Sequence, residues 1–205
     1  MSIADTSIAA ASAAFSGVAA LAAWRASREA NSTAASVAQI ERDRWHNDLT
    51  PQLRLMVREA YRDMIVRFDG PASLGRLTLQ LHVRDDRDRS QDPVLAGSVT
   101  QEMRAEVIWG PYRFRPGIDG ADERGRAVSP FTLEPGDRTK VAIDPSLRPT
   151  WYEGPDGERR WRDEYRTARM RLWAECQAPG HKPWRLSFEV SRDGNWACTP
   201  PMAGV

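Results

Sequence analysis

The sequence predicts a mainly β protein, an antiparallel immunoglobulin-like β-sandwich preceded by one long N-terminal α-helix. Two observations lead to this prediction. Residues 6–48 are rich in alanine and have the composition of a helix. From Pro51 onward, apolar and polar residues alternate in short segments separated by turn signals, which is typical of half-buried strands. The sequence shows no regular alternation of strands and helices, so a parallel sheet is not predicted.

The helix predicted over residues 6–48 would reach roughly 65 Å, far more than a small domain needs. Its first part, Ser7–Trp24, carries no charged residue, and charges begin at Arg25 and Arg28. We expect the helix to end before Thr50, because a residue that precedes proline is pushed out of the helical conformation. Residues 1–48 therefore form one unit, residues 49–192 the β-domain and residues 193–205 a loosely held tail.

Three interpretations of the uncharged stretch compete. A secretory signal peptide fits poorly, because Asp5 stands where basic residues are expected. A membrane anchor has just enough length, about 18 residues, but alanine contributes little to insertion. Self-association is the third interpretation, because the small residues Ala13 and Gly17 lie on one face with Leu21 and allow close helix approach. We expect a cytoplasmic protein, with the cytoplasmic face of a membrane as the alternative.

About seven strands are predicted after the helix. They are Leu53–Val57, Met64–Phe68, Leu77–Val83, Val128–Leu133, Thr139–Ile143, Met170–Cys176 and Trp184–Val190. The fourth and fifth are predicted to form a hairpin around Glu134–Asp137. Gln101–Glu106 is compatible with a short helix or a strand, and Glu158–Tyr165 is predicted to form one or two helical turns.

The segment Trp109–Phe131 joins two parts of the β-domain. Its three prolines and four glycines predict that neither a helix nor a regular strand runs through it. A long irregular connection in a compact domain is usually functional or held down by its own side chains. If a small-ligand pocket lies under this segment, we expect Trp109, Tyr112, Phe114 and Trp151 to line it.

No arrangement of residues indicates catalysis, a cofactor or a metal. The three histidines, His46, His82 and His181, fall in unrelated segments, and no phosphate-binding loop or nucleophile motif is present. Cys176 lies on the apolar face of its strand, where burial suppresses thiolate formation. Both Cys176 and Cys198 are expected to be free thiols. A disulfide between them would form only if the tail folds back on the Cys176 strand.

Two acidic clusters are better explained as solvated turns than as cation sites. They comprise Asp85, Asp86 and Asp88 in the first and Asp119, Asp122 and Glu123 in the second. Neither has the spacing of a calcium loop, and arginines that would repel a cation are interleaved with both.

Basic residues recur at outward positions of the predicted strands. They are Arg54, Arg58, Arg76, Arg84, Lys140, Arg171 and Arg185. If these strands share one sheet, its outer face is basic and suits anionic lipid headgroups or a nucleic-acid backbone. Otherwise these arginines pair with acids. Trp173 lies among them, either exposed or under a cation–π stack, and with Arg171 it is a candidate partner contact. Because the net charge is only +1, a nucleic acid is not expected as the partner.

Three stretches of the chain resemble a group of uncharacterised proteins from high-GC Gram-positive bacteria such as the streptomycetes. The stretches are VAQIERDRWHND followed by LTPQLRL, the segment EVIWGPYRFRPGIDGADERGRAV, and the strand WRLSFEV. The resemblance covers most of the chain, and its most specific part lies within residues 109–122. It implies a bacterial, non-secreted protein. It carries no activity and no site residue.

These observations lead to a non-enzymatic interaction or scaffold protein as the main hypothesis. The N-terminal helix would tether the protein or join copies of it, and the β-domain would bind a partner through Trp109, Tyr112, Phe114, Trp151, Trp173 and Arg171. A small-ligand-binding sandwich is the first alternative. An enzyme with an unrecognised pair of carboxylates is the second.

Overall fold

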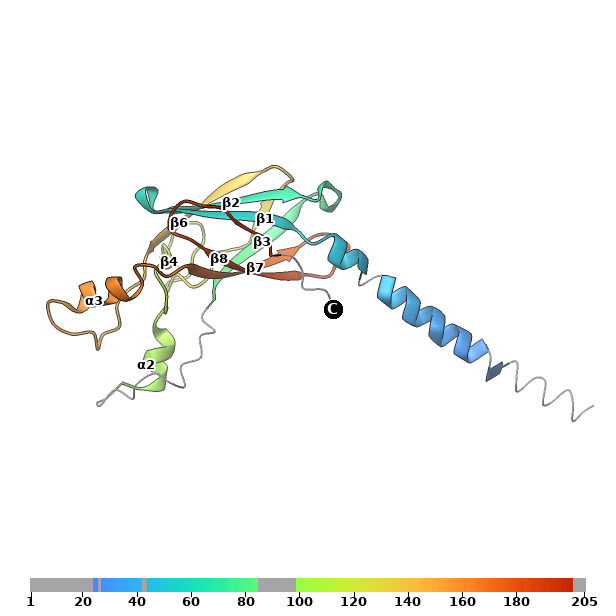
Figure 1. The fold of residues 1–205 in the computed structure, drawn as a ribbon, viewed down its shortest axis with the longest axis horizontal. Helices are drawn as coiled ribbons and strands as arrows, with labels where there is room; N and C mark the ends of the chain where they lie inside the picture. The colour runs from blue at the N-terminus through green and yellow to red at the C-terminus, as the bar shows by residue number, and fades with distance from the viewer. Residues whose placement is uncertain (1–23, 26, 42–43, 85–98, 201–205) are drawn as a thin grey trace, which may run out of the picture. The chain divides into compact units, whose positions relative to one another are not determined.

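The computed structural model describes residues 24–25, 27–41, 44–84 and 99–200 of the 205-residue chain (Figure 1). The chain divides into two compact units, residues 1–48 and residues 49–205. Each unit is therefore described by itself.

The first unit contains a helix over residues 24–25, 27–41 and 44–48 of the described chain. It ends before Thr50, as Pro51 predicts. Trp24 and Arg28 lie one turn apart, and the guanidinium carbon of Arg28 is 4.3 Å from the centre of the Trp24 ring. None of the described helices has the length and apolar character needed to cross a membrane. The uncharged residues before Trp24, with Ala13, Gly17 and Leu21, lie outside the described part.

The second unit is mainly β and contains two antiparallel sheets. The first has the strand order β4 (Tyr112–Phe114), β6 (Arg138–Pro145), β2 (Asp63–Gly70), β1 (Gln52–Arg58) and β9 (Ala197–Cys198). The second has the order β5 (Phe131–Leu133), β3 (Leu77–Val83), β7 (Met170–Gln177) and β8 (Trp184–Val190). Short 3-10 turns at Glu59–Tyr61 and Ala72–Leu74 follow β1 and β2.

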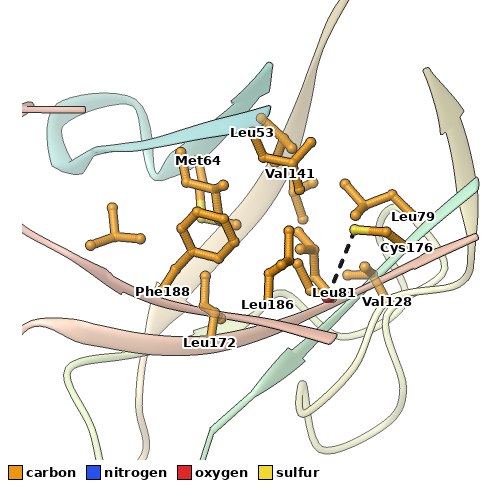
Figure 2. Packing of buried hydrophobic residues seen from close by; sticks show 14 of the residues in the cluster. Leu53, Met64, Leu79, Leu81, Val128, Val141, Leu172, Cys176, Leu186 and Phe188 are labelled. Atoms are coloured by element: carbon orange, nitrogen blue, oxygen red, sulfur yellow. Dashed lines mark hydrogen bonds between the residues drawn. The ribbon is translucent and has the colours of Figure 1, made fainter. Parts of the chain in front are cut away.

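The two sheets share one hydrophobic core (Figure 2). The alternating residues of β1, Leu53, Leu55 and Val57, are almost completely buried, as their period-two pattern predicts. Figure 2 shows Leu53 and Met64 from the first sheet opposite Leu172 and Phe188 from the second. Full burial of such a side chain stabilises the fold by about 1.5–3 kcal/mol relative to leaving it exposed.

The predicted hairpin around Glu134–Asp137 is wrong. The turn is present, because the backbone N–H of Asp137 donates to the carbonyl of Glu134 at 2.9 Å. However, β5 pairs with β3 in one sheet, and β6 pairs with β2 and β4 in the other. The turn therefore carries the chain across the core. Local alternation predicts the strands, but it does not specify their partners.

Two further expectations need correction. Segment 109–131 contains a short strand, β4, because Tyr112 and Phe114 alternate inward beside β6. The tail is held at residues 197–199: β9 pairs with β1, and the N–H of Leu53 donates to the hydroxyl of Thr199 at 2.7 Å. Gln101–Glu106, for which a helix and a strand were both compatible with the sequence, is helix α2. The helical turns predicted over Glu158–Tyr165 are found as helix α3, Gly157–Glu164.

Candidate functional site

An aromatic cluster lies at one end of the β-domain, where α2 and α3 extend beyond the sheets (Figure 1). The central ring is Trp161 of α3, which is 1% exposed. Its centre lies 5.8 Å from Trp109, 5.5 Å from Tyr152 and 4.6 Å from Tyr165. Trp151 extends the cluster through Trp109, at 6.3 Å. These five residues form a small core of their own, because none of them belongs to the main one.

Hydrogen bonds from the indole groups fix the aromatic cluster to the backbone. The Nε1 of Trp161 donates to the hydroxyl of Ser146 at 3.1 Å, and this hydroxyl donates to the carbonyl of Gly110. The Nε1 of Trp109 donates to the carbonyl of Arg104 at the end of α2, at 3.2 Å. Arg126 donates to the carbonyl of Val107 at 3.0 Å. The two helices are therefore attached to the strands through specific polar contacts as well as stacking.

A pocket of about 200 Å³ opens between the aromatic cluster and β4, with Tyr112, Trp161 and Tyr165 in its lining. Arg192 pairs with Glu59 and donates to the backbone carbonyl of Arg166 at 2.8 Å. The Tyr112 hydroxyl is buried and has no hydrogen-bond partner among the described residues. Burial raises the pKa of Tyr112, against the opposing positive charge of Arg192. The lining of this pocket is therefore mixed, with the charged side chains of Glu59, Asp163 and Arg166 beside the aromatic rings.

The four residues expected to line one pocket are divided by the structure. Tyr112 lines the pocket just described, whereas Trp151 lines a different hollow beside α2. Trp109 is half-buried within the aromatic cluster. Phe114 is completely buried in the main core, so no partner can reach it without unfolding the domain. The expectation that Phe114 contacts a partner or ligand is therefore corrected.

Trp173 lies on the outer face of β7 and is half-buried. The guanidinium carbons of Arg84 and Arg185 lie 4.8 and 4.5 Å from the centre of its ring. Of the two expectations for Trp173, the cation–π stack is the one found. Arg171, on the same strand, faces Glu189 at 3.9 Å.

The outward basic residues do not share one sheet. Arg54, Arg58 and Lys140 belong to strands of the first sheet, whereas Arg171 and Arg185 belong to the second. Most of them face acids: Arg54 pairs with Asp69, Arg58 with Asp63 and Arg185 with Glu175. The single basic face considered from the sequence is therefore not formed, and the alternative of pairing with acids describes these arginines.

Polar groups that were weighed for chemistry serve the fold. The carboxylate of Asp122 accepts hydrogen bonds from the backbone N–H groups of Arg124, Arg126 and Ala127, each at 2.9 Å. The carboxylate of Asp119 accepts one from the N–H of Ala142 at 2.7 Å. Among the described residues, no three His, Cys, Asp or Glu side chains converge as metal ligands. Asp85, Asp86 and Asp88 lie outside the described part.

Both cysteines are free, Cys176 buried and Cys198 exposed. Burial, with a smaller contribution from the charge of Glu175, raises the pKa of the Cys176 thiol to about 12. The tail pairs with β1 of the other sheet, so it does not bring Cys198 beside the Cys176 strand as a neighbouring strand.

Sequence reasoning missed Trp161, the centre of the aromatic cluster. The available signal was the spacing of Trp161 and Tyr165, which lie four residues apart in a predicted helix and therefore share a face. No family model, curated protein or solved structure matches this chain.

Proposed function

We propose that the protein is a non-enzymatic interaction protein, in which the N-terminal helix joins copies of the chain and the β-domain carries the surface for a further partner. One observation carries the proposal. The described helix exposes four large apolar side chains, Trp24, Val37, Ile40 and Trp45, each with more than half of its surface accessible. Large apolar groups concentrated on an unpacked helix are typical of surfaces that bind.

The arrangement of these residues around the helix supports self-association. At 100° per residue, Ala30, Ala34 and Val37 fall on one side, with spacings of four and three residues. Ser32, Ser36 and Gln39 fall on the opposite side. Alanines on this apolar side allow a second helix to approach closely. Large side chains such as Val37 would add apolar surface that is buried between the two helices.

We also propose that the β-domain belongs to the immunoglobulin-like class. The strand order β1-β2-β6-β4 corresponds to A-B-E-D of that class, and β5-β3-β7-β8 corresponds to C′-C-F-G. One departure is that β4 precedes β5 along the chain, whereas strand C′ normally precedes D. The correspondence supports a partner-binding role only by analogy, because sandwiches of this kind serve many functions.

Mass in solution, measured by light scattering after gel filtration, tests the helix. We expect the full chain to have a multiple of the monomer mass and residues 49–205 to have the monomer mass. Val37→Asp on the apolar side should return the full chain to monomer. Ser36→Asp places the same residue on the polar side and should leave the assembly intact.

A full chain that stays monomeric at high concentration would rule out self-association. Flotation with vesicles then separates the remaining roles of the helix. Flotation that resists alkaline carbonate would identify a membrane anchor, whereas release by salt would identify a peripheral contact. Two free cysteines support a reducing, cytoplasmic location for either arrangement.

A further inference from the structure

A hollow of about 310 Å³ lies beside α2, bounded on the other side by residues 147–151. Its lining is mainly apolar and is contributed by Met103, Val107, Ile108, Leu147 and Trp151. Leu147 is 62% exposed at the edge of the hollow, whereas Ile108 is buried at 5%. An apolar concave surface of this size is at the lower limit of what small-ligand sites in proteins offer.

Arg113 is the unusual member of this lining. It belongs to β4, and because its neighbours Tyr112 and Phe114 point into the core, its own side chain points away from the core. The Nε of Arg113 is buried and makes no hydrogen bond to the described residues. A guanidinium is always protonated, and Arg113 lines the hollow, so an anion bound there would balance its charge.

The other charged groups of the lining do not compensate Arg113. Glu106 pairs with Arg124 at 2.9 Å, and Arg148 faces Glu158 at 3.7 Å. Glu123 is the remaining carboxylate of the lining, and it is solvent-exposed. Among the described residues that line the hollow, the carboxylate of Glu123 is the one that could form an ion pair with Arg113 in place of a ligand.

We infer that this hollow binds a small apolar monocarboxylate. The carboxylate pairs with the guanidinium of Arg113, and the hydrocarbon part lies along Val107, Leu147 and Trp151. A carboxylate is favoured over other acceptors because its geometry and charge match the guanidinium. At about 30 Å³ for each water molecule in the liquid, the hollow has room for roughly ten waters, a space comparable to that of a medium-chain carboxylate. The inference is independent of the role proposed for the N-terminal helix.

Calorimetric titration of the full chain with octanoate tests the inference, with octan-1-ol as a neutral probe of equal chain length. We expect saturable one-site binding of octanoate and at least about tenfold weaker binding of the alcohol, since a charge-assisted hydrogen bond is lost. Absence of saturable octanoate binding, or equal binding of the alcohol, would overturn the inference.

Two arginine variants locate the site. Arg113→Gln should weaken octanoate binding by roughly tenfold or more, whereas Arg124→Gln, at the exposed rim, should change it by less than about threefold. Leu147→Ser removes an exposed apolar contact without disturbing the fold and should also weaken binding. If Arg113→Gln fails to fold, octanoate binding by the Leu147→Ser variant tests whether the hollow is the binding site. Wild-type affinity in Leu147→Ser, or in a folded Arg113→Gln, would contradict the assignment.

Glu123→Gln separates a ligand site from an internal ion pair. If Arg113 serves a ligand, the variant binds octanoate as tightly as the wild type or more tightly, and its melting temperature without ligand is unchanged. A lower melting temperature without ligand, together with no saturable octanoate binding to either protein, would show that Arg113 serves an internal ion pair with Glu123, and the inference would fall.

Discussion

The indole N–H of Trp161 in α3 donates a 3.1 Å hydrogen bond to the hydroxyl of Ser146, which follows β6 directly. Both residues are buried, with 1% and 5% of their surfaces exposed. The same hydroxyl donates to the carbonyl of Gly110, just before β4. One serine therefore connects the aromatic cluster to the edge of the first sheet, and it also lines the pocket beside β4.

Ser146→Ala should lower the free energy of unfolding by about 1–3 kcal/mol, because it leaves the buried indole N–H and the Gly110 carbonyl without partners. Urea denaturation followed by circular dichroism measures the change. Ser129→Ala is the matched control, since the exposed hydroxyl of Ser129 also donates to a carbonyl, that of Gly120 at 3.0 Å. It should cost less than about 1 kcal/mol. Equal losses in the two variants would contradict the role of burial.

Gly125→Ala should destabilise the domain much more than Gly117→Ala. Both glycines have positive φ, +75° and +74°. A Cβ at Gly125 would lie 2.1 Å from the carbonyl oxygen of Phe114, whereas one at Gly117 would meet nothing within 4 Å. We expect about 1–2 kcal/mol for Gly117→Ala from conformational strain, and roughly 3 kcal/mol or more for Gly125→Ala. Thermal unfolding of both variants provides the measurement, and similar melting temperatures would refute the expectation.

Asp122 predicts a pH dependence of stability. Burial by itself would raise the pKa of Asp122, but hydrogen bonds from the N–H groups of Arg126, Ala127, Gly125 and Arg124 outweigh it and lower the pKa. A folded-state pKa below the unfolded value of about 3.9 stabilises the protein above that pH, and this contribution is lost as pH falls through the folded pKa.

Asp122→Asn should therefore be less stable than the wild type near neutral pH, by about 1–2 kcal/mol, because the amide retains one acceptor but no charge. Urea denaturation at neutral pH and near pH 3 tests this prediction. The difference between the two proteins should narrow at the lower pH. A difference that stays constant would show that the charge of Asp122 does not contribute.

The elements that local patterns specify were predicted, and those that depend on distant pairing were not. Leu53, Leu55 and Val57 show in sequence the alternation that buries them, and Pro51 marks the end of the helix. In contrast, nothing near Phe131 indicates that its partner is β3 rather than β6. Pairing is decided by which apolar faces meet across the core, and that information is distributed over the whole chain.

The candidate site shows the same division. The outward pattern places arginines around Trp173, and two arginines do stack on its ring. Phe114 was selected for its place in an irregular segment, yet it alternates with Arg113 in a strand too short to be recognised. Arg113 carries the inference about the hollow beside α2, and a single arginine in a loop-like segment gives no signal of burial.

The two thiols should react at very different rates. Cys198 is exposed, whereas burial and the charge of Glu175 raise the pKa of Cys176 to about 12. Because the thiolate is the nucleophile, on the order of one Cys176 in ten thousand is reactive at pH 8.

Ellman's reagent should therefore titrate one thiol rapidly in the folded protein and two in guanidinium chloride. Cys198→Ser should abolish the rapid phase, and Cys176→Ser should leave it intact. Two rapid thiols in the folded protein would mean that β7 opens readily and that the core is less rigid than the packing in Figure 2 indicates.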